Sequence, residues 1–128
     1  MTEAQLHKQI VDYLHLQYPN IIFNTDMAGQ KLSIGQAIKA SKLRSSNGFP
    51  DICIYEPKNN RVLETHFCGL FLEVKKETPY LKNGTLKKDK HILEQSEMHA
   101  KLNEKGYYAC FVWTFEGAKC IIDTYLNQ

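Results

Sequence analysis

Segments with the periodicity of helices and segments with the composition of strands alternate along this chain. Helical spacing of apolar residues is found over about residues 2–17, 33–42, 89–105 and 116–126. Runs typical of strands occupy residues 21–23, 51–55, 70–75 and 107–113. Because the alternation shows no internal repeat and no linker, we expect one α/β domain over residues 1–128, with a central mixed sheet flanked by helices.

Local signals indicate where two of the helices begin and end. Thr2 and Gln5 have the spacing of a capping box, which favours a helix start at the first residues of the chain. Asp89 is suited to cap the long helix at its start, because a short carboxylate side chain can accept the first free amides. Gly106 follows the last apolar position of that helix and is expected to end it.

Two shorter elements are expected before the middle of the chain. Residues 33–42 have the spacing of a short helix, with Ile34, Ala37 and Ile38 expected to face the core. Residues 57–60, with the sequence Pro-Lys-Asn-Asn, are expected to form a turn.

The composition is that of an ordinary globular protein. Of the 128 residues, 43% are hydrophobic and 23% are charged, which excludes a disordered or fibrous chain. No apolar run approaches the roughly 20 residues that cross a bilayer. The polar start of the chain also has no hydrophobic signal region. We therefore expect a cytoplasmic protein with no membrane partner.

The cysteines give no sign of a metal centre or a redox pair. They stand at positions 53, 68, 110 and 120, without a C-x-x-C pair and without zinc-ligand spacing. Cys53 and Cys110 fall inside strand-like runs. Buried, reduced thiols are therefore expected.

Basic residues are concentrated in two segments, although the net charge is only +2. Ten of the sixteen lysines and arginines lie there: Lys31, Lys39, Lys42, Arg44, Lys75, Lys76, Lys82, Lys87, Lys88 and Lys90. Such clustering is typical of a surface that binds a polyanion. On charge alone, an ordinary solvated surface explains the pattern equally well.

The strand at 70–75 carries two charged side chains within an apolar run. Because side chains two residues apart share a face, Glu73 and Lys75 lie on the same side of the strand. A buried charge without a partner is unfavourable, so these side chains need each other, another charge or a metal ion. If residues 51–55 pair antiparallel with this strand, Asp51 joins them at one end of the sheet.

Two carboxylates and an ammonium group at one end of a sheet can form a hydrolytic site. Oxygen ligands of this kind suit Mg²⁺ or Mn²⁺. A bound metal ion would neutralise charge on a phosphodiester and lower the pKa of a bound water, which the lysine would orient. The spacing also fits a structural ion pair between Lys75 and Glu73 or Asp51, and this alternative stays open.

Three features of the sequence resemble a nuclease family. Gly48-Phe49-Pro50-Asp51 precedes Glu73-Val74-Lys75 on a following strand, and Gln95 lies on the next helix. In this order they resemble the signature of the PD-(D/E)XK nucleases, and more narrowly the VRR-NUC branch with its stand-alone phage proteins. The resemblance covers nearly the whole chain. It implies a restriction-endonuclease-like fold and a DNA endonuclease that depends on Mg²⁺ or Mn²⁺.

The resemblance also implies roles for individual residues. Asp51 and Glu73 would bind the metal ion through their carboxylates, with the backbone carbonyl of Val74 as a further ligand. Lys75 would position and activate the attacking water molecule. Asp51, Glu73 and Lys75 are therefore the expected centre of the catalytic site.

Gln95 and Glu3 are the remaining candidate catalytic residues. Gln95 matches a helical glutamine that lines the family's site, although on an apolar helix face it could instead bond to a core backbone group. Glu3 matches an acidic residue of the family's first helix and would add a metal ligand. A glutamate in the first turn also simply favours the helix dipole.

The family further implies the substrate and the assembly. It indicates branched DNA such as Holliday junctions, cut by a homodimer whose two sites address two symmetric strands. The residues expected to contact DNA phosphates are Lys31, Lys39, Lys42, Arg44, Lys76, Lys82, Lys87 and Lys88. Two alternatives remain: a non-catalytic DNA-binding module with a nuclease fold, and a nuclease that acts on linear duplex, flaps or RNA.

Overall fold

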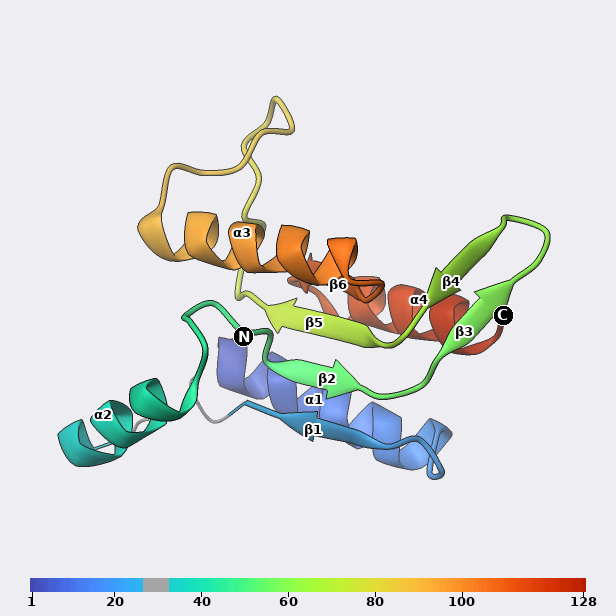
Figure 1. The fold of residues 1–128 in the computed structure, drawn as a ribbon, viewed down its shortest axis with the longest axis horizontal. Helices are drawn as coiled ribbons and strands as arrows, with labels where there is room; N and C mark the ends of the chain where they lie inside the picture. Colours follow the sequence, from blue (N-terminus) through green and yellow to red (C-terminus); the bar gives the residue numbers. More distant parts are fainter. Residues whose placement is uncertain (27–32) are drawn as a thin grey trace.

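The computed structural model describes residues 1–26 and 33–128, which form a sheet with helices on both faces (Figure 1). The helices are α1 (Glu3–Gln17), α2 (Ile34–Leu43), α3 (Lys90–Glu104) and α4 (Phe115–Leu126). The strands are β1 (Phe23–Thr25), β2 (Ile52–Ile54), β3 (Lys58–Asn60), β4 (Thr65–Phe67), β5 (Leu70–Val74) and β6 (Tyr108–Val112). The predicted α/β fold class is confirmed.

The central sheet is mixed, with strand order β1-β2-β5-β6. The β1–β2 and β2–β5 pairs are antiparallel, whereas β5 and β6 run parallel. Ile52 pairs with Leu72 and Ile54 with Leu70, which confirms the predicted antiparallel pairing of the two segments. Between them, β3 and β4 form a separate two-stranded hairpin at the far end of β2 and β5 (Figure 1).

The expected capping interactions are present at the helix ends. Thr2 and Gln5 exchange both bonds of the capping box, at 2.8 and 3.1 Å. The Asp89 carboxylate accepts hydrogen bonds from the backbone amides of the first turn of α3. Gly106 takes a φ of 95°, a conformation open to glycine, and the chain turns there into β6. Local sequence signals therefore fix both helices that carry candidate site residues.

The main core lies between the sheet and the pair α1 and α4. Apolar side chains from both helices and from β2, β5 and β6 meet there: Leu6, Ile10, Leu14, Ile52, Ile54, Leu70, Leu72, Val74, Val112, Ala118, Ile122, Tyr125 and Leu126. The opposite face of β5 and β6 packs against α3, where the rings of His99 and Phe111 lie 4.6 Å apart. Glu73 points to this second face, because its neighbours Leu72 and Val74 belong to the main core.

The expectation that one face of α2 packs against the core is wrong. Ser33 caps this helix, but Ile34 is 82% exposed, Ile38 is 52% exposed, and Ala37 is exposed too. The periodicity therefore predicted the helix but not its packing, because α2 stands apart from the sheet (Figure 1). The core cluster found within residues 1–26 and 33–128 includes no residue of α2.

Two strand predictions also need correction. The first strand begins at Phe23 rather than at 21, because the Ile21 amide closes a turn onto the Tyr18 carbonyl at 3.1 Å. Residues 58–60 form β3 rather than a turn, although asparagine is a poor strand former. Pairing with β4 stabilises this short strand, and such a tertiary partner is not visible in the local sequence.

The cysteines are reduced but less buried than expected. All four are free, and Cys53 and Cys110 lie half-buried in β2 and β6. Cys68 and Cys120 are exposed, which corrects the expectation of buried thiols. Among residues 1–26 and 33–128, no helix has the length and hydropathy required to cross a membrane.

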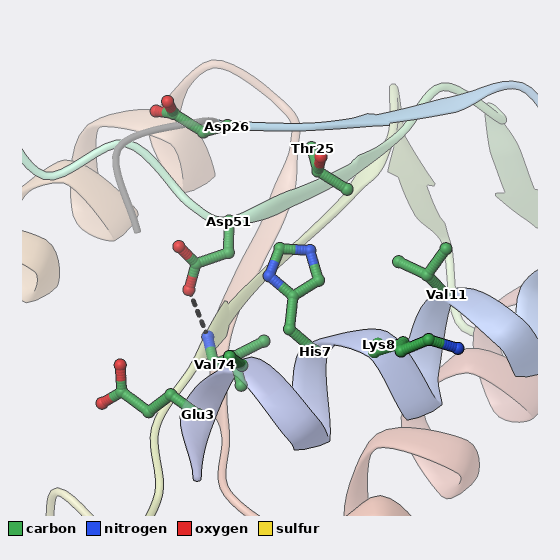
Figure 2. A pocket seen from close by; sticks show the side chains of 9 residues that line it. Glu3, His7, Lys8, Val11, Thr25, Asp26, Asp51 and Val74 are labelled. Carbon is green, nitrogen blue, oxygen red and sulfur yellow. Dashed lines mark hydrogen bonds between the residues drawn. The ribbon is translucent and has the colours of Figure 1, made fainter. Parts of the chain in front are cut away.

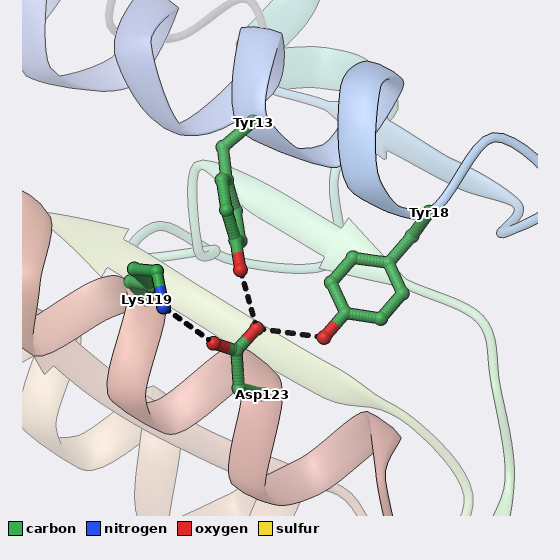
Figure 3. A network of polar contacts seen from close by, with 4 residues as sticks. All are labelled: Tyr13, Tyr18, Lys119 and Asp123. Carbon is green, nitrogen blue, oxygen red and sulfur yellow. Dashed lines mark hydrogen bonds and ion pairs between the residues drawn. The ribbon is translucent and has the colours of Figure 1, made fainter.

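A polar cluster joins α1 to α4 at the edge of the core (Figure 3). The hydroxyls of Tyr13 and Tyr18 both donate to Asp123 Oδ1 at 2.6 Å, and Lys119 donates to Oδ2 at 2.9 Å. Burial alone raises the pKa of Asp123, but the hydrogen bonds from these three partners outweigh it and lower the pKa to about 2. Asp123 therefore stays ionised and holds the two helices together.

We predict that Asp123→Asn lowers the free energy of unfolding by about 1–3 kcal/mol near neutral pH, because a charged acceptor of three hydrogen bonds is removed. The folded pKa is depressed, so the wild-type advantage is present above about pH 4 and disappears as the pH falls towards 2. Urea unfolding at several pH values measures both effects.

Asp12→Asn is the matched control, because Asp12 also pairs with a lysine four residues away but is 61% exposed, against 27% for Asp123. Asp12→Asn should lower the free energy of unfolding by less than about 0.5 kcal/mol. Equal costs for the two variants would contradict the structural role of Asp123.

Candidate active site

The Asp51 carboxylate lies just before β2, beside the end of β5. Its Oδ2 accepts a hydrogen bond from the backbone N–H of Val74 at 2.8 Å (Figure 2). The carbonyl oxygen of Asp51 also accepts a hydrogen bond from the Asp26 N–H at 2.8 Å. These bonds hold Asp51 between β1 and β5, so its side chain faces the end of the strand that carries Glu73.

Glu73 is a buried acid in the middle of a buried strand. Its side chain is only 3% exposed, although all other residues of β5 are apolar. Burial raises the pKa of Glu73 well above its usual range, and the hydrogen bond and charge of Asp51 raise it further. Lys75 lowers the pKa but does not compensate for these effects. Glu73 therefore holds a proton at neutral pH unless a cation approaches it.

Lys75 follows β5 directly and is half-buried. Its backbone N–H donates to the Val112 carbonyl at 2.8 Å, so the pairing of β5 with β6 extends to the lysine. Lys75, Glu73 and Asp51 take part in none of the ion pairs found within residues 1–26 and 33–128. The structural ion pair that the spacing allowed is therefore not formed among these described residues.

Gln95 comes to the site from α3. It is half-buried, and its Oε1 is a buried acceptor without a partner among the described residues. The core backbone bond that the sequence left open for this oxygen is thus absent in that part of the chain. An unpaired buried acceptor is unfavourable, so the Gln95 side chain is suited to bind a group that enters the site.

Close packing of Gly48 against α3 brings Gln95 towards Asp51. Gly48 has a φ of 89°, and a Cβ atom there would lie 2.9 Å from the Glu94 carbonyl oxygen and 3.4 Å from the Gln95 Cα. No side chain fits that gap. The glycine therefore lets the chain that leads into Asp51 run directly along α3.

All five candidate catalytic residues line one cavity of about 400 Å³. Glu3 reaches it from the first turn of α1, and its charge raises the pKa of Glu73 together with the larger effects of burial and Asp51. The complete lining is Glu3, Arg44, Asn47, Gly48, Phe49, Asp51, Glu73, Val74, Lys75, His91, Glu94 and Gln95. Residues that are 92 positions apart in sequence, Glu3 and Gln95, thus meet in one place.

Sequence reasoning missed several of these lining residues. His91 lies one helical turn before Gln95, and this spacing of four could have placed it on the same face of α3. Arg44 was expected only as a DNA contact, but it also lines the cavity. Asn47 and Phe49 gave no signal apart from their neighbours in the Gly48–Asp51 turn.

A second cavity of about 260 Å³ adjoins the first (Figure 2). The two cavities share Glu3, Asp51 and Val74 as lining residues. On its other sides the second cavity is lined by Ala4, His7, Lys8, Val11, Thr25 and Asp26. Asp51 is therefore accessible from two sides, one between β5 and α3 and the other between α1 and β1.

His99 lies on α3 one turn beyond Gln95 and is buried. Only 5% of it is exposed, and its Nε2 has no partner among the described residues. Burial and, to a smaller extent, the positive charge of Lys75 together lower the pKa of His99 to about 4. His99 is thus a neutral imidazole at physiological pH, close enough to Lys75 and Asp51 to sense their charges.

The donor set fits an oxygen-preferring divalent cation only in part. No group of three or more His, Cys, Asp or Glu side chains within residues 1–26 and 33–128 is arranged to hold a metal ion. Asp51 and Glu73 do supply two adjacent carboxylates, and Glu73 is buried without a compensating charge. A cation there would need the Val74 carbonyl or water as further ligands, because such ions take six or more oxygens.

The predicted DNA-contact residues occupy two separate places. Lys39 and Lys42 are exposed on α2, and Arg44 is half-buried directly after it. Lys76, Lys82 and Lys88 are exposed in the segment between β5 and α3, whereas Lys87 pairs with Glu77 at 3.7 Å. Lys31 lies outside the described residues.

We predict that Gly48→Ala lowers the free energy of unfolding by at least about 1 kcal/mol more than Gly84→Ala does, as measured by chemical denaturation. Gly84 has a similar φ of 86° but open space around it, so its substitution costs only the backbone strain of about 1–2 kcal/mol. Gly48→Ala adds a clash with the α3 backbone. Equal costs would show that α3 does not pack closely on Gly48.

The comparisons with known proteins bear on the fold. No model of a known protein family matches this sequence, and no curated protein matches it. The solved structure of a VRR_NUC domain protein superposes with a TM-score of 0.68 and covers 99% of this chain and 89% of that one, at 17% sequence identity. This chain therefore has the fold of that VRR_NUC domain protein, as its sequence motifs indicated.

Proposed function

We propose that this protein is a metal-dependent endonuclease that hydrolyses phosphodiester bonds in DNA. The observation that carries the proposal is the buried Glu73 beside Asp51, at a cavity that Lys75 and Gln95 also line. A buried acid with a strongly perturbed pKa in a cleft is characteristic of catalytic sites. The nuclease fold supports the same function.

Asp51 and Glu73 would hold Mg²⁺ or Mn²⁺ through their carboxylates, with the Val74 carbonyl and Glu3 as further ligands. The metal ion, when bound, supplies positive charge to the non-bridging phosphate oxygens and a bound water of lowered pKa. Glu73 would bind the ion as a carboxylate, because the cation would supply the positive charge that this buried position lacks. The Val74 amide keeps the Asp51 carboxylate oriented throughout, since it donates to Oδ2.

Lys75 and Gln95 would handle the attacking water and the phosphate. The Lys75 ammonium is free of ion pairs among the described residues, so it can donate to a phosphate oxygen and to the water. The unpaired Gln95 Oε1 can accept a hydrogen bond from that water and fix its direction. Such positioning contributes much of the rate acceleration in hydrolytic enzymes.

The two basic regions support DNA as the substrate. In Figure 1, α2 and the segment between β5 and α3 project from the end of the molecule where β5 ends, with the start of β2 between them. Lys39 and Lys42 on one side and Lys82 and Lys88 on the other can each contact phosphates. Contacts of this kind position a duplex without reading its sequence.

Branched DNA and a homodimer complete the proposal. A junction presents two symmetric strands, and a two-fold dimer would bring one site to each of them. A nuclease that acts on linear duplex, flaps or RNA is the second candidate within the same chemistry. A non-catalytic DNA-binding module would be the outcome if the protein binds DNA without turnover.

We predict that the protein cuts a labelled four-way DNA junction with Mg²⁺ or Mn²⁺, and that EDTA abolishes cutting. Lys75→Ala should lower the cleavage rate by at least about 100-fold, because the water loses its positioning group. Gel analysis of the products measures the rate and the cut positions. The exposed Lys101→Ala is the matched control and should cut at the wild-type rate.

The same assay with linear duplex separates the alternatives. Paired nicks in the junction alone would support a resolvase, whereas equal cutting of linear duplex would remove junction selectivity and keep the nuclease. Binding of the junction without cutting in either metal would contradict the catalytic proposal.

A further inference from the structure

The lysine-rich segment between β5 and α3 is a folded arm. The arm comprises residues 76–88 and projects beyond α3 (Figure 1). Its two sides form an isolated antiparallel bridge between Tyr80 and Leu86. The Leu81 N–H donates to the Thr85 carbonyl at 2.7 Å, and the Lys87 N–H donates to the Pro79 carbonyl at 2.9 Å. The arm therefore has the hydrogen bonding of a small hairpin.

Tyr80 fastens this arm to the edge of the central sheet. Its ring packs edge-on against Trp113, with centroids 5.8 Å apart, and against Phe111 at 6.4 Å. Phe111 belongs to β6, the strand that runs parallel to β5, and it is buried. Pro79 at the base of the arm is fully buried. Aromatic contacts of this geometry add stabilisation beyond the burial of area.

Both ends of the arm connect directly to elements that carry candidate active-site residues. The arm begins immediately after Lys75, which lines the main cavity. It is followed directly by Asp89, the cap of α3, and the first turns of that helix supply His91 and Gln95 to the same cavity. A shift of the arm relative to β6 would therefore also displace Lys75 or the start of α3 at the site.

The arm carries positive charge that is not neutralised internally. Lys76, Lys82 and Lys88 are exposed, and none of them forms an ion pair within residues 1–26 and 33–128. Lys87 is paired with Glu77 at 3.7 Å. Lys82 stands beside the Asn83-Gly84 turn at the tip, where Gly84 takes a φ of 86°. The free charges thus lie at the tip and at both ends of the base, next to β5 and next to α3.

We propose that the arm is a preformed binding site for the sugar-phosphate backbone of the DNA duplex next to the cut, and that Tyr80 is its anchor. The inference rests on the proposed nuclease function and specifies how its substrate is held. A pre-ordered arm loses little conformational entropy on binding, which raises affinity without any added contact. Lys82 and Lys88 supply the charge, while Tyr80 fixes the position of that charge relative to Glu73 and Lys75.

The test measures DNA binding separately from cleavage. Fluorescence anisotropy of a labelled linear duplex, in EDTA and over a series of salt concentrations, gives the affinity and its salt dependence. The double variant Lys82→Ala/Lys88→Ala should reduce the slope of log affinity against log salt by about 0.9 for each phosphate that it no longer neutralises, or about 2 in total. Arg61→Ala/Lys101→Ala removes two exposed charges away from the arm and should leave the slope unchanged.

Tyr80→Ala tests the anchor itself. It keeps every charge, so we expect the salt slope to stay the same while affinity falls by roughly three- to tenfold. Tyr80→Phe retains both ring contacts and should bind as the wild type does. Thermal unfolding of each variant excludes a general loss of fold, and the exposed lysine variants test the arm even if Tyr80→Ala unfolds.

Two results would overturn the inference. One is an unchanged salt slope in the Lys82→Ala/Lys88→Ala protein, and the other is full affinity in a folded Tyr80→Ala protein. Because binding is measured in EDTA, these results do not depend on turnover. If the arm variants behave as expected but the protein cuts no DNA with Mg²⁺ or Mn²⁺, the catalytic proposal fails and the proposal that the arm binds DNA is retained.

Discussion

The hydrogen bond from the Val74 amide to the Asp51 carboxylate connects the fold to the site. It joins the residue before β2 to the last residue of β5, two points that are 23 positions apart in sequence. Because β2 and β5 pair antiparallel in a fixed register, this bond forms only when Ile52 lies opposite Leu72. The same register then places Asp51 beside Glu73, so the closeness of the two acids follows from strand pairing.

Burial of Glu73 lowers the stability of the fold, and favourable interactions elsewhere in the structure offset this loss. An acid that is 3% exposed weakens the strand that carries it, since burial and Asp51 both oppose its ionisation. The main core on the opposite face of the sheet consists of aliphatic side chains and Tyr125. The cluster around Asp123 also joins α1 to α4 at the edge of that core. Unfavourable groups retained in this way are typical of functional sites.

The sequence predicted most clearly what depends on local chemistry and on strand alternation. The capping residues Thr2 and Asp89 and the antiparallel partners of β2 are found as expected, because their signals lie within a few residues or within one pairing rule. The proximity of Asp51 and Glu73 was predicted from that strand pairing. Gln95 and Glu3 were placed by family resemblance, and the structure brings both to the same cavity.

What the sequence did not predict depends on distant partners. The apolar residues of α2 have helical spacing, yet nothing in the spacing shows that the helix stands apart from the sheet. The strand β3 exists only because β4 pairs with it. The aromatic contact between Tyr80 and Trp113 joins residues 33 positions apart in sequence, and their aromatic character alone did not indicate it.

Anomalous diffraction from crystals grown or soaked with Mn²⁺ would locate the metal ion without reference to activity, and it therefore tests the proposed metal site itself. We predict an anomalous peak between the carboxylates of Asp51 and Glu73, within coordination distance of the Val74 carbonyl oxygen, and no such peak in Glu73→Gln crystals. Crystals that contain Mn²⁺ but show no peak at this position would contradict a metal-dependent site at Glu73.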